Sequence, residues 1–267
     1  MLDEDKRITP FEYITKYPPS PRFMHLRVSS LCYQLVILFY PLVTSMLAYG
    51  QENQTQEEAK LSMLQMCEAG NIEAQSEMGV LYQTGQLVPQ DYGEAVKWYR
   101  KAADQGDARA QCNLAVLTKL GFGASQDYRM AAKLFEKASK QGHKQAQYNY
   151  GICFLRGQGV PKDYQEALVW IRKSADQGYA PAQCDLGICY ENGEGVRQDF
   201  QEAAKWVRMA ADQGLPIGQY QLGFYYYHGA GVPKDIVQAL KWNRKAADQG
   251  YEPALQAMGA YRIKKTK

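Results

Sequence analysis

The hexapeptide KAADQG occupies residues 101–106 and returns unchanged at residues 245–250. The two copies lie 144 residues apart, which is four intervals of 36. Altered copies fill the three intermediate registers, where EKASKQG ends at Gly142, RKSADQG at Gly178 and RMAADQG at Gly214. A fixed period of about 20 to 50 residues indicates a stacked repeat architecture. The period therefore decides the fold.

One interval, residues 146–179, predicts two helices with a break between them. Small and apolar residues recur at helical spacing until the segment RGQGVPKD, whose glycines and proline end the first helix. Asp163 and Glu166 then form a capping-box pair, in which the aspartate accepts from a free backbone N–H and the glutamate reaches back. Gly178 ends the second helix. Each interval is therefore expected to fold as a helix pair.

The same start signal recurs in the other intervals. Capping pairs are Asp91 with Glu94, Asp199 with Glu202 and Asp235 with Gln238, whereas Asp127 lacks a partner because Met130 stands at the second position. The loss of one cap costs about 1 kcal/mol. An array in which every repeat is held by its neighbours can tolerate that loss.

Bulky and small residues also keep the period. All four tryptophans share one repeat position, with Leu134 in the remaining copy: Trp98, Trp170, Trp206 and Trp242. A small residue recurs in the middle of each first helix, at Gly79, Ala115, Gly151, Gly187, Gly223 and Gly259. Because glycine costs about 1 kcal/mol relative to alanine there, we infer a close approach by the paired helix. The matching small positions are Ala95, Ala131, Ala167, Ala203 and Ala239.

These patterns divide the chain into segments. We expect a non-native or disordered leader, a signal peptide or N-terminal anchor, a linker, a capping helix, five repeats and a second capping helix. The corresponding residues are 1–23, 24–50, 51–54, 55–70, 71–107, 108–143, 144–179, 180–215, 216–251 and 252–267.

Residues 31–47, LCYQLVILFYPLVTSML, form the one long apolar run. A basic flank with Arg22 and Arg27 precedes this run, and small residues follow it at the spacing of a cleavage site. This is the layout of a secretory signal, and a start at Met24 would give it the usual short basic head. We expect a secreted or periplasmic protein. The alternative is a membrane anchor through residues 31–47.

Several functional classes lack the residues they need. The formal net charge of +3 is slight and no long run of like charges occurs, so we expect no nucleic-acid partner. No P-loop, HExxH or GxSxG motif is present, and only His143 and His228 follow the signal segment, so no catalytic, cofactor or metal site is expected. Five cysteines follow that segment without a disulfide framework or paired CxxC motifs. We expect them to be buried, reduced and apolar in character.

The combined motifs AxAQ, LGxxY, GxGVPxDY, AxxW and KAAxQG resemble the Sel-one-like repeat family, a relative of the tetratricopeptide repeats. The resemblance covers about residues 55–263, and the second copy departs most, with Thr118, Ser125 and Leu134 at three motif positions. It implies an all-α fold, namely an α-solenoid that forms a right-handed superhelix of antiparallel helix pairs. It also implies a non-catalytic scaffold or adaptor of an exported bacterial type that binds a protein or peptide on its concave face.

Two other functions stay open at this point. Cysteine-rich members of the same family are described as penicillin binders with β-lactamase activity, although their pattern of two cysteines per repeat and an SxxK motif are missing here. A structural or chaperone-like envelope protein is the second alternative.

A partner-binding surface is expected on the first helices, at positions that packing does not use. The residues at these positions, compared from one repeat to the next, become more aromatic towards the C-terminus, where FYYYHG spans residues 224–229. Tyrosine-rich surfaces are common at interface hot spots. The candidate protein-binding residues are Tyr148, Ile152, Glu191, Tyr220, Phe224 and Tyr227. The alternative is that these side chains pack against the adjacent repeat or the capping helix.

Overall fold

The computed structural model describes residues 57–265, with side chains up to residue 258. The chain divides into two units, Met1–Ala59 and Lys60–Lys267, and nearly all described residues belong to the second. The proposed signal segment 31–47, Met24 and the linker 51–54 lie outside the described residues. Within those residues, no helix has both the length and the apolar character needed to cross a membrane.

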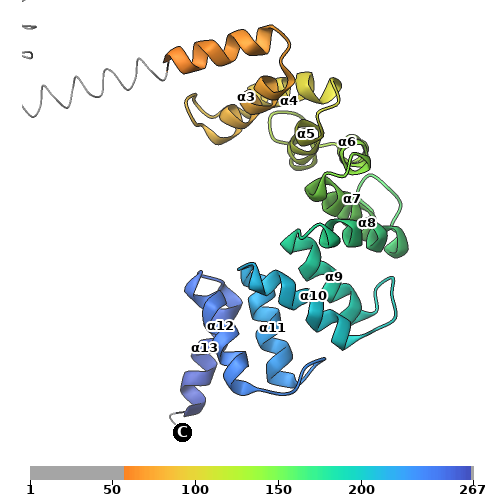
Figure 1. The fold of residues 1–267 in the computed structure, drawn as a ribbon, viewed down its shortest axis with the longest axis vertical. Helices are drawn as coiled ribbons and strands as arrows, with labels where there is room; N and C mark the ends of the chain where they lie inside the picture. Colours follow the sequence, from red (N-terminus) through yellow and green to blue (C-terminus); the bar gives the residue numbers. More distant parts are fainter. Residues whose placement is uncertain (1–56, 266–267) are drawn as a thin grey trace, which may run out of the picture. The chain divides into compact units, whose positions relative to one another are not determined.

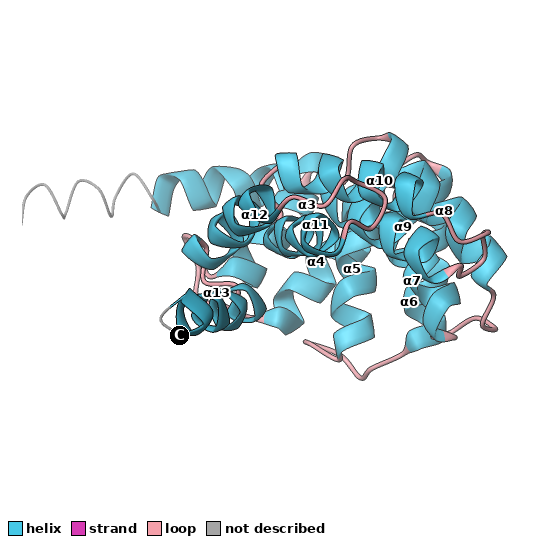
Figure 2. Ribbon diagram, turned by 90° about the horizontal axis from the view of Figure 1, so that it is seen from below, coloured by secondary structure: helices cyan, strands magenta, loops and turns pink. Residues whose placement is uncertain are grey.

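Every regular element of the described residues is an α-helix (Figure 2). A helix over residues 57–68 comes first. The first helices of the repeats are α3 (Ile72–Thr84), α5 (Ala108–Leu120), α7 (Lys144–Arg156), α9 (Ala180–Asn192) and α11 (Pro216–His228). The second helices are α4 (Tyr92–Asp104), α6 (Tyr128–Lys140), α8 (Tyr164–Asp176), α10 (Phe200–Asp212) and α12 (Ile236–Asp248). The last helix is α13 (Glu252–Lys265).

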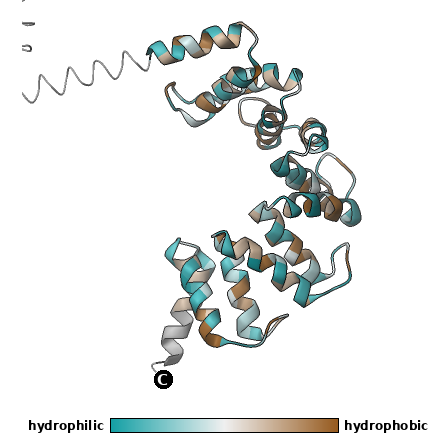
Figure 3. Cartoon of the chain, viewed as in Figure 1, coloured by the Kyte–Doolittle hydropathy of each residue, from teal (hydrophilic) through white to brown (hydrophobic). Residues whose placement is uncertain are grey.

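The helices form a sequential array in which each packs against the helix before it and the helix after it (Figure 1). The two helices of one repeat make the most extensive contacts, and each second helix then packs against the first helix of the next repeat. Apolar and polar residues share every helix, because each one buries only the sides that face its neighbours (Figure 3). The expected all-α repeat architecture is confirmed.

The second helices start at the predicted aspartates. Asp163 Oδ1 accepts from the backbone N–H groups of Gln165 and Glu166 at 2.9 and 3.0 Å. Asp127 caps α6 in the same way, although it lacks the glutamate partner. The glutamates behave differently from the capping-box expectation: Glu166 Oε1 accepts from Trp170 Nε1 at 2.8 Å, and Glu94 pairs with Lys97 at 2.6 Å. Each of these carboxylates therefore has a partner one turn further along its own helix.

The mid-helix glycines confirm the inferred close approach. A Cβ atom on Gly151 would lie 2.7 Å from Ile171 Cγ1 and 2.9 Å from the Ala167 carbonyl oxygen. Gly187 faces the same obstruction from Val207 and from the oxygen of Ala203. The small alanines of the second helices were predicted correctly. Beside them lies a row of residues that is almost fully buried in every repeat: Tyr99, Phe135, Ile171, Val207 and Asn243.

The tryptophans are packing residues at the border of the core. Trp98 and Trp242 are buried, whereas Trp170 and Trp206 are half-buried against neighbouring clusters. A lysine three residues later covers the ring in three copies; its Nζ lies 4.0 Å from the Trp98 ring centre in the case of Lys101. This contact buries the indole further and leaves the ammonium group in water.

Candidate protein-binding surface

The first helices carry the six predicted binding residues, and the structure places them in three different environments. Ile152 is only 6% exposed and packs with Ile171 and Leu186 in a core cluster. It contributes to the interior of the array, so it is no longer a candidate for partner contact.

Tyr148 joins two consecutive first helices. Its hydroxyl on α7 donates to Asp185 Oδ2 on α9 at 2.9 Å, and its ring meets the ring of Tyr179 edge-on at 5.5 Å. Burial raises the pKa of the Asp185 carboxyl, although the Tyr148 hydroxyl and the nearby Arg156 oppose that shift. Burial, reinforced by Asp185, raises the pKa of Tyr148 as well. This side chain therefore already has partners within the array.

Glu191 plays a comparable role one repeat later. Its Oε2 accepts from Gln221 Nε2 and from the Tyr225 hydroxyl, each at 2.7 Å. Both donors lie on α11, so the carboxylate ties α9 to α11. Burial raises the pKa of Tyr225, with Glu191 adding to the effect. One oxygen of Glu191 thus has two internal donors.

Aromatic side chains on α11 provide the most exposed of the predicted positions. Phe224 is 39% exposed, and its ring lies 4.3 Å from the ring of His228. Tyr227 is half-buried and meets His228 edge-on at 4.9 Å. Tyr220 is half-buried and lies 5.6 Å from the ring of Tyr251. We call Tyr220, Phe224, Tyr227 and His228 the α11 aromatic surface.

His228 was not among the predicted binding residues, because the two histidines after the signal segment were weighed only as metal ligands or catalytic groups, and neither role was expected. It lies one turn after Phe224 and next to Tyr227, so helical spacing alone could have placed it on this surface. The described residues contain no group of histidine, cysteine and acidic side chains that could hold a metal ion. The α11 aromatic surface therefore offers aromatic and apolar contacts, with the polar groups of its tyrosines and His228 at the edges.

The cysteines supply no reactive group. All five in the described residues are free and buried: Cys67, Cys112, Cys153, Cys184 and Cys189. Burial raises the pKa of the Cys112, Cys184 and Cys189 thiols to about 12 in each case. The thiolate is the reactive form, so these residues act as small apolar side chains, as expected.

The fold and this surface define a helical repeat protein with an exposed aromatic face and no catalytic constellation among the described residues. The Sel1 repeat matches five consecutive segments of the chain, residues 72–107, 108–143, 144–179, 180–215 and 216–251. The chain belongs to the Sel1 repeat family.

Solved structures agree with that assignment. The protein c5321, described as a protective antigen of uropathogenic Escherichia coli with an SLR fold, is 33% identical over 79% of this chain, with a TM-score of 0.66. This chain spans 49% of that protein's length. A Sel1 repeat protein from Oxalobacter formigenes is 33% identical over 77% of this chain and 84% of its own, with a TM-score of 0.68. Among curated protein sequences, none matches this chain.

A more distant structure shows the same fold. The Sel1 repeat protein from Klebsiella pneumoniae is 23% identical over 74% of this chain and 97% of its own, with a TM-score of 0.50.

Proposed function

We propose that this protein is a non-catalytic scaffold that binds a partner protein or an extended peptide on the surface formed by its first helices. The observation that carries the proposal is the exposure of Phe224 among Tyr220, Tyr227 and His228. Aromatic side chains bury large apolar areas at small cost in side-chain entropy, which is why they dominate interface hot spots. Tyr148 and Glu191 contribute to this surface by fixing the spacing of α7, α9 and α11.

The test compares the proposed surface with a phenylalanine of similar exposure to Phe224 on a second helix. The double variant Phe224→Ala/Tyr227→Ala alters the proposed surface, and Phe200→Ala alters a phenylalanine on α10 that is 40% exposed. Affinity capture on the native chain, with mass spectrometry of the retained proteins, identifies the partner. We expect the amount of partner captured by the double variant to fall at least tenfold, and the amount captured by Phe200→Ala to stay the same. Equal retention by both folded variants would remove the α11 aromatic surface from consideration.

We also propose export of the protein. The apolar run 31–47 with its basic flank supports a cleaved signal. The description of the related c5321 protein as a protective antigen is consistent with a location accessible to antibodies. Intact-mass measurement of a C-terminally tagged chain recovered from the periplasm or medium tests this proposal. A mature N-terminus near Gln51 supports cleavage, whereas a membrane-bound chain that retains residues 31–47 supports the anchor.

A further inference from the structure

The helix over residues 57–68 has the register of a second helix, but no described first helix precedes it. Met63 stands 36 residues before Tyr99, and Met66 stands 36 residues before Ala102. In the complete repeats these two positions face the first helix of the same repeat. The equivalent Ile171 packs against Gly151, and Ser174 Oγ donates to the Lys144 carbonyl oxygen at 2.7 Å.

Burial at these positions differs sharply between this helix and the repeats. The position of Met66 is 0% exposed in every repeat, at Ala102, Ala138, Ser174, Ala210 and Ala246. Met66 itself is 42% exposed. Met63 is half-buried, whereas Tyr99 at the equivalent position is fully buried. Among the described residues, no helix covers this face, which the architecture closes with a first helix in every repeat.

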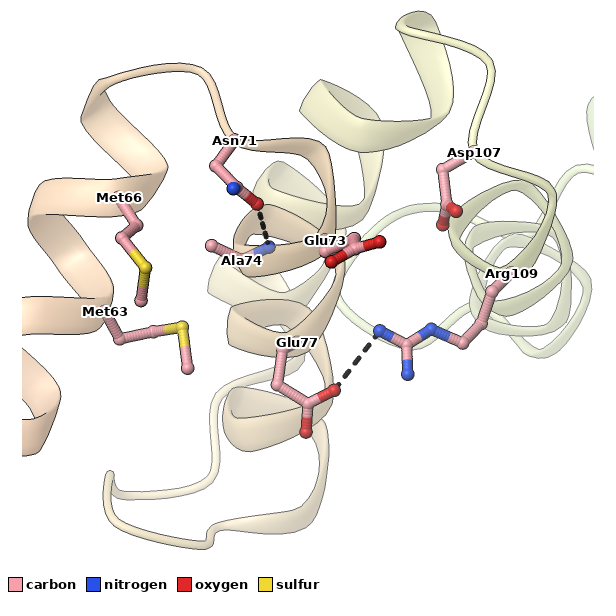
Figure 4. Close-up of a pocket in the computed structure, with 8 residues that line it drawn as sticks. All are labelled: Met63, Met66, Asn71, Glu73, Ala74, Glu77, Asp107 and Arg109. Atoms are coloured by element: carbon pink, nitrogen blue, oxygen red, sulfur yellow. Dashed lines mark hydrogen bonds and ion pairs between the residues drawn. The ribbon is translucent and has the colours of Figure 1, made fainter.

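A hollow of about 670 Å³ lies along this face (Figure 4). Met63 and Met66 form one wall, Glu73 and Glu77 project from α3, and Arg109 projects from the start of α5. Methionine is flexible and polarisable, so a methionine wall adapts to the shape of an incoming apolar side chain.

The charge of the hollow is negative. Its three carboxylates, Glu73, Glu77 and Asp107, oppose the single cation Arg109. Arg109 is already engaged: its Nη2 lies 3.2 Å from Glu77 Oε2, and its Nε donates to Ser76 Oγ at 3.2 Å. Glu73 is exposed, and no described residue pairs with it. An excess of carboxylate beside an apolar wall favours a cationic, amphipathic ligand.

We propose that this face, the N-terminal seam of Met63, Met66, Glu73 and Glu77, docks an amphipathic helix of a partner protein in the place that a first helix takes in the repeats. The apolar stripe of that helix carries a small residue at its centre, as Gly151 and Gly187 do opposite Ile171 and Val207. Lysine or arginine on its polar side faces the glutamates. This surface is separate from the α11 aromatic surface and does not depend on it.

The chain's own upstream sequence fits the seam poorly. Residues 36–48 stand one 36-residue interval before α3, but Pro41 falls at the position of Glu77 and Val43 at the position of Gly79. Proline inside a helix costs about 3 kcal/mol. Valine at the glycine position places a branched side chain where the repeats allow none. The observations therefore favour a helix from another protein.

Two helices of this chain supply matched probes. A peptide with the sequence of residues 144–156 carries Lys144 and Arg156 and no acidic residue, whereas residues 180–192 carry Asp185 and Glu191 and no cation. Both contain the central glycine. With cysteines replaced by serine and an outward lactam bridge to stabilise the helix, each is titrated against the full chain by fluorescence anisotropy. We expect the basic peptide to bind at least tenfold more tightly than the acidic one, with an affinity that falls as salt rises.

Matched variants locate the binding. Met66→Lys should weaken the basic peptide at least tenfold, whereas Leu61→Lys, on the same helix and 58% exposed, should not. Glu73→Lys should weaken it at least fivefold, and the exposed Glu68→Lys, outside the hollow, should have a smaller effect. If Met66→Lys lowers the melting temperature, its loss of binding could come from unfolding. The comparison of Glu73→Lys with Glu68→Lys then tests the location of the site by itself.

Three results of the binding experiments would overturn the proposal. They are absence of basic-peptide binding to the full chain, equal affinity of the chain for the two peptides, and an equal loss of basic-peptide affinity in each seam variant and its control. Concentration-dependent self-association that Met66→Lys abolishes would also overturn it, because the occupant would then be a second copy of this chain.

Discussion

The side-chain nitrogen of Gln177 donates a hydrogen bond to the side-chain oxygen of Gln147 at 2.7 Å, and the side-chain nitrogen of Gln147 donates to the Ser139 carbonyl oxygen at 3.2 Å. One buried glutamine therefore joins the end of α6, the start of α7 and the turn after α8. The same pair recurs in all five repeats, as Gln75–Gln105, Gln111–Gln141, Gln147–Gln177, Gln183–Gln213 and Gln219–Gln249. It explains the glutamines of the AxAQ and KAAxQG motifs.

Gln147→Leu should destabilise the array. The substitution removes two hydrogen bonds, one that Gln147 Nε2 donates to the Ser139 carbonyl oxygen and one that Gln147 Oε1 accepts from Gln177, and each contributes about 0.5–1.5 kcal/mol. Urea unfolding followed by circular dichroism measures the loss. The exposed Gln165, which lies on the solvent side of α8, provides the control; Gln165→Leu should change the free energy of unfolding by less than about 0.5 kcal/mol. Equal effects would show that the bridge contributes nothing.

Gly151→Ala should also destabilise, although alanine has the higher helix propensity. The added Cβ would lie 2.7 Å from Ile171 Cγ1 and 2.9 Å from the Ala167 oxygen, so α7 and α8 must move apart. Overpacking of this kind costs about 1–3 kcal/mol. Ala115→Gly, at the same repeat position, should cost about 1 kcal/mol through helix propensity and about 1 kcal/mol more through loss of the buried methyl group. Thermal melts of both variants compare the two costs, and a stabilised Gly151→Ala protein would contradict the close packing.

Much of the architecture could be predicted from the sequence because its signals are local. Asp163 starts a helix through contacts two and three residues away, and Gly178 has a positive φ of 78° at the turn that follows the helix. The glutamine bridge could not be predicted in the same way, because it joins residues 30 positions apart on different helices. The glutamates of the predicted capping boxes were assigned wrong partners for a related reason, since Trp170 and Lys97 compete for them on the same helix faces.

The binding surface was harder to predict than the fold. Ile152 and Phe224 occupy the same repeat position, yet the first is 6% exposed and the second 39%. A 36-residue period assigns equal burial to equivalent positions and cannot express such a difference. Side-chain size and the identity of neighbouring residues decide it, and these vary from one repeat to the next. The exposure of Met66 was not predicted either. It depends on whether a first helix covers the helix over residues 57–68, and the repeat pattern implies such a helix beside every second helix.

The native protein should resist thiol reagents. Burial raises the pKa of Cys112, Cys184 and Cys189 to about 12, so little thiolate exists at pH 8 and the sulfur atoms are shielded. Iodoacetamide treatment followed by peptide mass spectrometry should show these three sites unmodified in the native chain and fully modified in urea. Rapid native labelling of any of them would mean that the surrounding helices open readily.

Protonation of His143 should weaken the fold below pH 6.5. His143 Nδ1 accepts the N–H of Ala146 at 3.2 Å as the N-cap of α7, which requires a neutral ring. Burial lowers its pKa from the ordinary 6.5; Asp107 opposes this shift, whereas Lys144 and Arg109 add to it. The unfolded chain therefore binds the proton more readily than the folded one, so stability is complete above pH 6.5 and falls as the pH drops towards the lowered pKa.

His143→Asn should remove this part of the pH dependence, since asparagine caps a helix without titrating, as Asn71 does for α3. The measurement is the free energy of unfolding in urea at intervals between pH 7.5 and 5, for the native chain, His143→Asn and His228→Asn. Subtracting the His143→Asn curve cancels the contribution of the carboxylates that all three proteins share. We expect the native chain and His228→Asn to lose stability together relative to His143→Asn as the pH falls. A constant difference across the range would mean that His143 keeps the same protonation behaviour in the folded and unfolded chain.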